Sequence, residues 1–405
     1  MGICIKEALR IIQSNVTKVS FEIIPIENTQ NRISAQDIYA THSLPTFNNS
    51  AMDGYGVKLS DASKKVKVID SIFAGSSKQT NFNESQCIKI MTGARVPSSV
   101  DAVIPHELVE IVDEDYIILP SNIKQNQHVR FLGEDIKKED KILNIGDEIN
   151  FATITMLSSQ GITHVKVYRQ PKISVFTSGE ELKLHYEKIE DYQIYNSNTP
   201  TLLARAKELG ADVTFVGMAK DNIESLKEMI SNSLYADFII TSGGVSVGEA
   251  DFTKDAFNEF DMEVLFDGIT IKPGKPTVFG KIGNTYVLNL PGNPLAAALI
   301  FEVFGKIILQ ILTGNKKVYH NYIATKLSED LPNRKGRTTI IPGFFDGEYF
   351  IPSEKRLPGM VGVLHNCNSI IVLDKHNELI KKDSQVKVLP INWKFFTQIQ
   401  KDLFS

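Results

Sequence analysis

The sequence has little of what would reveal a functional class at once. It contains three cysteines, Cys4, Cys87 and Cys367, whose number and spacing match neither a disulfide framework nor a zinc motif. Cysteines used so sparingly are typical of proteins in a reducing compartment. The first residues also lack the apolar core of a signal peptide. We therefore expect a cytoplasmic protein.

The sequence also lacks a strong excess of charge and an uninterrupted apolar run of membrane length. Its formal net charge is −4, whereas nucleic-acid-binding proteins usually carry a marked basic excess. The best candidate for a membrane span, residues 294–312, is interrupted by Glu302 and Lys306. We expect a buried helix there, and neither a nucleic acid nor a membrane as a partner.

The pattern of the chain predicts a multidomain protein of the α/β plus β class, because 405 residues exceed what one hydrophobic core usually holds. Residues 1–168 predict a mixed N-terminal linker domain, with a nested β insertion at about 46–135. Strand and helix alternate over 169–316, which predicts a three-layer α/β domain with a mostly parallel sheet. Residues 317–393 hold short strand-like runs and predict a small, barrel-like β domain.

A glycine-rich loop, Thr241–Asp251, follows one predicted strand of the α/β domain and precedes a helix. Its glycines permit positive φ and a close backbone approach to a ligand. Successive backbone N–H groups in such a loop can cradle a phosphate, and Asp251 is suited to a divalent cation beside it. A tight turn without a ligand explains the glycines equally well.

A second loop, Thr177–Leu182, leaves the first strand of the same domain and places Glu180 beside the same crevice. Carboxylates at adjacent strand ends repel each other unless a cation or a proton lies between them. This pairing predicts a metal site formed by Glu180 and Asp251. A solvated Glu180 is the alternative, since glutamates in loops are usually exposed.

Two proline-containing turns complete the set of loops. In the first, Lys272 and Lys275 flank a Pro-Gly pair, and the prolines stiffen the backbone so that the two ammonium groups suit a small oxyanion. The second, Leu290–Pro294, is a sharp strand-to-helix turn that we expect to place backbone groups against a ligand.

Taken together, the motifs resemble those of the MoeA-type molybdopterin molybdenumtransferases, the family that includes the gephyrin E domain. The resemblance covers residues 1–315 well and the remainder weakly. The motifs occur in the family's order: Asn-Ser-Ala-Met-Asp-Gly-Tyr at 49–55, Met-Thr-Gly-Ala at 91–94, Gly-Glu-Asp-Ile at 133–136, Ser-Gly-Glu-Glu-Leu at 178–182, Ser-Gly-Gly-Val-Ser-Val-Gly-Glu-Ala-Asp at 242–251, Lys-Pro-Gly-Lys-Pro at 272–276 and Leu-Pro-Gly-Asn-Pro at 290–294.

The resemblance implies a reaction and an assembly. Adenylylated molybdopterin and molybdate, the two substrates, would give molybdenum cofactor and AMP, with Mg²⁺ as cofactor. It further implies a MogA-like central domain and an elongated homodimer whose active site lies between the subunits. A MogA-type adenylyltransferase is a further candidate partner under this resemblance.

The resemblance also assigns roles to residues. Catalytic roles fall to the acidic residues of the cleft and to a group expected from the partner subunit: Asp53, Thr92, Asp135, Glu180, Asp221 and Asp251. Substrate-binding roles fall to the loops described above and to one arginine: Arg130, Ser178, Gly179, Ser242, Gly243, Gly244, Ser246, Gly248, Lys272, Pro273, Lys275, Pro276, Pro291, Asn293 and Pro294.

One segment departs from the family pattern. Many members have a Gly-His-Gln-Gly-Ser-like loop in the last domain, where this chain has Arg356–Gly362 and no serine. Arg356 is a candidate replacement charge, and the preference for molybdate or tungstate stays open. A non-catalytic scaffold paralogue and an adenylyltransferase are the alternatives. The presence of Glu180, Asp221 and Asp251 favours the insertase over the scaffold, and the β insertion and the C-terminal domain argue against the adenylyltransferase.

Overall fold

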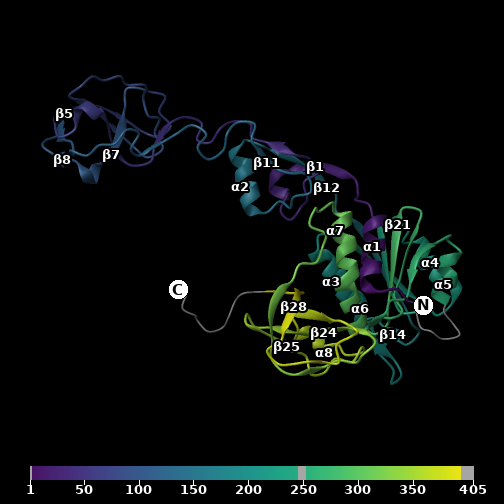
Figure 1. Ribbon diagram of the computed structural model, residues 1–405. Helices are drawn as coiled ribbons and strands as arrows, with labels where there is room; N and C mark the ends of the chain where they lie inside the picture. The colour runs from purple at the N-terminus through teal and green to yellow at the C-terminus, as the bar shows by residue number, and fades with distance from the viewer. Residues whose placement is uncertain (1, 245–251, 394–405) are drawn as a thin grey trace. The chain divides into compact units, whose positions relative to one another are not determined.

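The computed structural model describes residues 2–244 and 252–393. The chain divides into two compact units (Figure 1). The larger unit contains the residues up to Gln36, Ile145–Phe151 and the residues from His164 onward, and the smaller unit contains Asp37–Asn144 and Ala152–Thr163. The smaller unit is thus inserted into the sequence of the larger one, and the predicted boundaries at residues 168 and 316 stay a prediction.

The larger unit is built on a six-stranded sheet. Its strands are, in spatial order, β16 (Asp212–Ala219), β13 (Lys172–Ser178), β17 (Phe238–Ser242), β21 (Thr285–Leu290), β20 (Val278–Ile282) and β18 (Glu263–Asp267). The first four are parallel, and the antiparallel pairings of β20 with β21 and of β18 with β20 extend the sheet. The predicted mostly parallel sheet is confirmed, and the antiparallel edge was not foreseen from the alternation of strand and helix.

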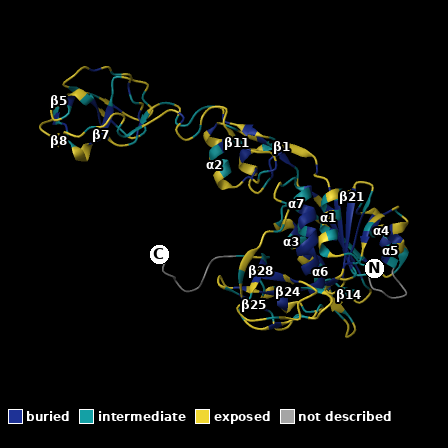
Figure 2. Cartoon of the chain, viewed as in Figure 1, coloured by how far each residue is buried: buried dark blue, intermediate teal, exposed yellow. Residues whose placement is uncertain are grey.

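Helices cover both faces of this sheet, which gives three layers. They are α1 (Ile5–Asn15), α3 (Asn198–Glu208), α4 (Ile223–Ser231), α5 (Phe252–Asn258), α6 (Pro294–Ile300) and α7 (Lys306–Leu312). Helices α1, α3, α6 and α7 share one core with side chains such as Ile240, whereas α4 and α5 share another with Ile239 (Figures 1 and 2). Alternate residues of one strand therefore serve opposite cores, as the strand period requires.

The apolar stretch Pro294–Leu312 forms α6, a π-helical turn (Phe301–Gly305) and α7. It is long and apolar enough for a membrane span, yet 78% of it lies buried inside the unit, which confirms the predicted buried helix. The Glu302 carboxylate, only 8% exposed, accepts hydrogen bonds from Arg205 Nε at 2.6 Å and Nη2 at 3.0 Å. This pairing offsets the cost of placing a charge in the core.

The C-terminal part of the larger unit is a five-stranded closed barrel, which confirms the predicted barrel-like domain. It closes because β24 pairs with both β25 and β26. The elements are β22 (Ile323–Leu327), β23 (Leu331–Pro332), β24 (Thr338–Phe345), β25 (Tyr349–Pro352), α8 (Gly362–His365), β26 (Ser369–Leu373), β27 (Leu379–Ile380) and β28 (Gln385–Pro390). A short strand from the α/β layer, β19 (Ile271–Lys272), pairs with β24.

The remaining short elements of the larger unit support these layers. The ribbon of β1 and β12 carries the chain toward the sheet, and β14 pairs with β15 beside the first strand end. The bounds are β1 (Phe21–Pro25), η1 (Ile26–Asn28), β12 (His164–Tyr168), β14 (Leu182–Lys183) and β15 (Ile194–Tyr195).

The smaller unit is mostly β, as predicted for the insertion. Its six-stranded sheet has the order β7-β4-β6-β5-β9-β8 and two small apolar cores. The elements are β2 (Ile38–Tyr39), β3 (Asn49–Ser50), β4 (Gly54–Val57), η2 (Leu59–Asp61), β5 (Lys65–Ile72), β6 (Gln86–Ile90), β7 (Ala102–Pro105), η3 (His106–Leu108), β8 (Glu110–Ile111), β9 (Tyr116–Ile118), β10 (Val129–Arg130), β11 (Lys141–Leu143) and α2 (Phe151–Ser159).

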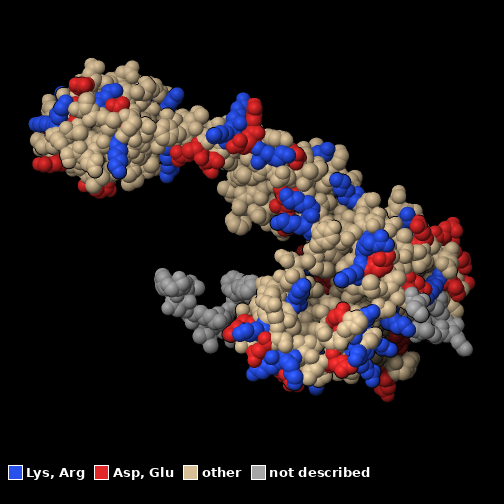
Figure 3. Space-filling view, viewed as in Figure 1, with Lys and Arg blue, Asp and Glu red and all other residues tan. Residues whose placement is uncertain are grey.

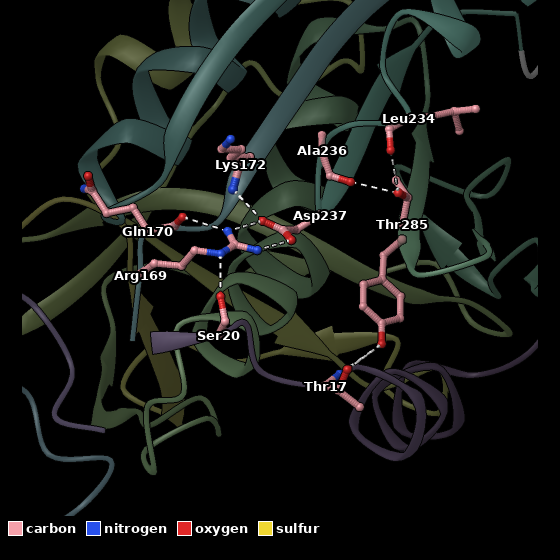
Figure 4. A network of polar contacts seen from close by, with 10 residues as sticks. Thr17, Ser20, Arg169, Gln170, Lys172, Leu234, Ala236, Asp237 and Thr285 are labelled. Atoms are coloured by element: carbon pink, nitrogen blue, oxygen red, sulfur yellow. Dashed lines mark hydrogen bonds and ion pairs between the residues drawn. The ribbon is translucent and has the colours of Figure 1, made fainter. Parts of the chain in front are cut away.

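A polar network fixes the amino ends of the central strands (Figure 4). Arg169 donates from Nη1 and Nη2 to the two carboxylate oxygens of Asp237, each at 2.6 Å, and this hydrogen bonding raises the pKa of Arg169. The backbone N–H of Lys172 donates to the same carboxylate at 2.8 Å. Arg169 Nε also donates to Ser20 Oγ at 3.0 Å, so the N-terminal segment is attached to the start of β13 and β17.

We expect the Asp237→Ala substitution to lower the free energy of unfolding by about 2–3 kcal/mol, because it leaves a partly buried guanidinium and a backbone N–H without their acceptor. Urea denaturation followed by circular dichroism measures the loss. The control is Glu7→Ala, which breaks an exposed ion pair with Arg10 and should cost less than about 0.5 kcal/mol. Equal effects of the two substitutions would contradict a role for this network.

Candidate active site

A cavity of about 760 Å³ lies at the carboxyl ends of the parallel strands, within the size range of small-molecule sites. It is formed by the loops after β13, β17 and β21, by the segment from β15 into α3, and by one barrel loop. The lining residues are Ser178, Gly179, Glu181, Leu182, Ile194, Tyr195, Asn196, Ser197, Asn198, Asp221, Ser242, Gly243, Gly244, Pro276, Pro291, Gly292, Asn293, Pro294, Gly359 and Val361.

Strand register explains why loops far apart in sequence line the same cavity. Thr177 of β13 is paired with Ser242 of β17, and Ser242 is paired with Leu290 of β21. Because the strands are parallel and end at one level, the segments that follow them start side by side. The structure thus brings together ten residues predicted from separate motifs: Ser178, Gly179, Asp221, Ser242, Gly243, Gly244, Pro276, Pro291, Asn293 and Pro294.

The two glycines after β17 have conformations and surroundings that other residues would not tolerate. Gly243 has a φ of +100° and Gly244 a φ of +66°. A Cβ on Gly244 would lie 2.0 Å from Thr253 Oγ1 and 2.8 Å from Ser178 Oγ, and one on Gly243 would lie 2.5 Å from Ser178 O. Bare backbone therefore faces the cavity at this loop, which suits an anion bound by N–H groups. Ser246, Gly248 and Asp251 of the same loop lie outside the described residues.

Carboxylates gather beside this backbone. Asp221, after β16, lines the cavity, and its Oδ2 accepts a hydrogen bond from the backbone N–H of Glu180 at 3.3 Å. Glu181 also lines the cavity, whereas the exposed Glu180 side chain is not part of the lining. Within residues 2–244 and 252–393, no three His, Cys, Asp or Glu side chains form a metal-binding cluster.

The predicted oxyanion lysines lie beyond this lining. Lys272 and Lys275 are exposed, and only Pro276 of their turn lines the cavity. Lys272 belongs to β19, whose pairing with β24 holds the turn against the barrel, and its peptide bond with Pro273 is cis. Acidic and basic side chains are interspersed over the face shown in Figure 3, so attraction of an anion depends on such local groups.

The predicted residues of the smaller unit are brought partly together. Pairing of β4 with β6 places Asp53 beside Thr92, whose backbone N–H donates to Asp53 Oδ1 at 2.7 Å. This hydrogen bond lowers the pKa of Asp53, so its carboxyl stays ionised well below neutral pH. Arg130 lies on β10, which pairs with β3, while Asp135 is held separately by a backbone hydrogen bond to Leu44.

Some cavity residues were missed by the sequence reading. Strand β15, which pairs with β14, contributes Ile194 and Tyr195, and no sequence motif indicated this strand. Asn198 is the first residue of α3, and its amide donates hydrogen bonds to Ser242 at the end of β17 and to Gly292 after β21. The Asn-Ser-Asn sequence before a helix was the available signal.

The barrel segment that departs from the family pattern also reaches the cavity. Gly359 and Val361 line it. Arg356, the candidate replacement charge, is absent from the lining and donates from Nη1 to Ser353 O at 2.8 Å.

Comparison with known families assigns most of the chain. Residues 3–161 match the model described as MoeA N-terminal region (domain I and II), and residues 174–310 match the one described as probable molybdopterin binding domain. A Haemophilus influenzae protein named molybdopterin molybdenumtransferase is 36% identical over 92% of this chain and 94% of its own length. A Staphylococcus epidermidis protein of the same name is 32% identical over 96% and 95%, respectively.

Solved structures give the same picture. The molybdopterin biosynthesis MoeA protein from Pyrococcus horikoshii superimposes with a TM-score of 0.82 and 30% identity, covering 97% of this chain and 100% of that one. A second structure from that organism has a TM-score of 0.85 at 24% identity, which supports the fold.

We expect Gly244→Ala to destabilise the protein more than Gly283→Ala does. Both positions have positive φ, but a Cβ on Gly283 meets nothing within 4 Å, so Gly283→Ala measures backbone strain alone. That strain costs about 1–2 kcal/mol. The contact with Thr253 and Ser178 should add about 1–3 kcal/mol. Chemical denaturation of both variants gives the difference, and indistinguishable values would show that the contact is relieved without cost.

Proposed function

The chain belongs to the MoeA family of molybdopterin molybdenumtransferases, and we propose that it inserts molybdenum from molybdate into adenylylated molybdopterin with release of AMP. The observation that carries the proposal is the single cavity shared by the Ser-Gly, Gly-Gly and Pro-Gly-Asn-Pro motifs. Its position at the carboxyl ends of parallel strands is where α/β sheets bind their ligands.

The phosphate end of the substrate would lie against the Gly243–Gly244 backbone. The hydroxyl of Ser178 lies beside this backbone and has no hydrogen-bond partner among the residues that the structure describes, so it is available as a donor. Ser246 and Gly248 would continue the cradle. Fixed backbone donors suit this task because they need no reorganisation when a phosphate binds.

Mg²⁺ fits the donor set of the cavity. Mg²⁺ is usually held by one or two carboxylates together with substrate phosphates. Asp221 supplies a carboxylate to the lining, and its Oδ2 accepts a hydrogen bond from the backbone N–H of Glu180, so the two residues are neighbours. Under the proposal Glu180 and Asp251 hold the ion, which when bound screens the repulsion between the phosphates and molybdate.

The other predicted residues would bind the oxyanion and complete the site. Lys272 and Lys275 would attract molybdate toward the cavity mouth. The group in the smaller unit would serve the active site of a second copy of the chain in a homodimer, where an ionised Asp53 acts as a hydrogen-bond acceptor. Holding molybdate beside the pterin sulfurs then gains from proximity.

Two further assignments belong to the proposal. The enzyme would act in the cytoplasm and would receive its substrate from a MogA-type adenylyltransferase. The barrel loop at Gly359 and Val361 lines the cavity without a serine, so tungstate is the alternative oxyanion. A scaffold paralogue that binds molybdopterin without turnover is the alternative function, and Asp221 on the cavity wall favours the enzyme.

The test is AMP release from adenylylated molybdopterin with Mg²⁺, measured with and without molybdate and with tungstate in its place. We expect molybdate-dependent AMP release, because the oxyanion must occupy its position before the anhydride is cleaved productively. Tight binding of the pterin without AMP release would contradict the enzyme function and support the scaffold function. Faster AMP release with tungstate than with molybdate would identify tungstate as the preferred oxyanion.

In the same assay we expect Asp251→Asn and Glu180→Gln each to lower the molybdate-dependent rate on the order of 100-fold, because under the proposal each removes a carboxylate ligand of Mg²⁺. Glu224→Gln, which neutralises an exposed carboxylate in the first turn of α4, is the matched control and should keep the rate. Near-normal turnover in Asp251→Asn would contradict a role of Asp251 in binding Mg²⁺.

A further inference from the structure

Two asparagines at the start of α3 have different tasks. Asn196, which is buried, acts on its own helix: its Oδ1 accepts from the backbone N–H of Thr199 at 3.1 Å, and its Nδ2 donates to Thr199 Oγ1 at 2.9 Å and to Thr177 Oγ1 at 3.0 Å. Asn196 thereby performs the local role of a helix cap. Asn198, two residues later, is left for another purpose.

The Asn198 amide connects loops that are distant in the sequence. Its Nδ2 donates to Ser242 Oγ at 2.7 Å and to the carbonyl oxygen of Gly292 at 2.7 Å. Ser242 ends β17 and Gly292 follows β21, so both hydrogens of one amide group join the two loops that line the cavity. Nothing in the helix itself requires these bonds.

The contact also fixes the role of Ser242. Its hydroxyl donates to Pro291 O at 3.0 Å and accepts from Asn198, so its one hydrogen is already used. A hydroxyl has a single hydrogen to donate. Ser242, which is 1% exposed, therefore helps to position the two loops and has no hydrogen left to donate to a ligand.

The two joined loops approach each other closely. A Cβ on Gly292 would lie 3.5 Å from the Cα of Gly243, and the N–H of Gly243 donates to Leu290 O at 3.3 Å. Asn198 closes this arrangement from the cavity side. A change in its length or charge would shift one loop relative to the other.

We propose that Asn198 is a positioning residue for the phosphate end of the pterin: it sets the separation at which the Gly243 loop and the Pro291–Gly292 turn face the same phosphate. The inference rests on the proposed function, since it takes molybdopterin as the ligand of this cavity. It assigns to Asn198 an effect on the phosphate and none on the ring of the pterin.

A binding experiment with two ligands separates this role from a purely structural one. Metal-free molybdopterin and its dephosphorylated form are titrated by calorimetry, without oxygen, into the full chain and into Asn198→Ala and Asn198→Asp. We expect Asn198→Ala to lower the affinity for molybdopterin about tenfold and the affinity for the dephosphorylated form less than about twofold. Asn198→Asp keeps the shape of the side chain but loses the donor and adds a negative charge, so we expect a larger loss for molybdopterin alone.

Asn333→Ala is the matched control. The Nδ2 of Asn333 also donates two hydrogen bonds, to the carbonyl oxygens of Asp374 and Asn377, but in the barrel and away from the cavity lining. We expect its melting temperature to fall about as much as that of Asn198→Ala while both affinities stay at the wild-type value. If Asn198→Ala does not fold, the near-isosteric Asn198→Asp carries the comparison.

The outcomes are distinct. Equal weakening of both ligands by the Asn198 substitutions, or no weakening, overturns the inference. If the wild-type protein binds both pterins equally, the phosphate does not contribute to binding. The inference about Asn198 is then overturned, although molybdopterin remains a ligand of the cavity. Wild-type protein that binds neither pterin refutes the proposed function itself.

Discussion

The parallel register of β13, β17 and β21 is the constraint on which the larger unit depends. Because these strands run in one direction and end at one level, the loops that follow them open at the same edge of the sheet. A slip of one residue would exchange the side chains of the two faces and with them the two apolar cores. The pair of Arg169 and Asp237 holds the amino ends of two of these strands, at the edge of the sheet opposite the cavity.

Beneath the cavity several buried polar side chains are hydrogen-bonded to one another. Thr241 Oγ1 donates to Asn289 Oδ1 at 2.7 Å, and Asn196 and Asn198 extend these contacts toward α3. Such networks are costly if any member lacks a partner, but when complete they rigidify their surroundings. The bare backbone at Gly243 and Gly244 is then held ready for an anion, which is the condition under which fixed dipoles are most effective.

Only some of the charged residues assigned to the site line the cavity. Asp221 reaches the lining, while Glu180 and the two lysines lie outside it. The backbone at Gly243 and Gly244 is thus closely packed, whereas the side chains of Asp221, Glu180 and the two lysines are exposed. The residues around Asp53 belong to a different unit, which has its own sheet and cores.

The sequence by itself determined the features that depend on local pattern. An apolar run interrupted by Glu302 and Lys306 indicated the buried helix at Pro294–Leu312. Paired glycines marked the bare loop after β17, because this signal lies within a few residues of its effect. Tertiary structure alone decided the antiparallel edge of β20 and β18, the use of Asn198 and the place of Lys272 and Lys275 outside the lining. The hydrogen bonds of Asn198 span 44 and 94 residues, and no periodicity in a sequence specifies which distant loops a single amide will join.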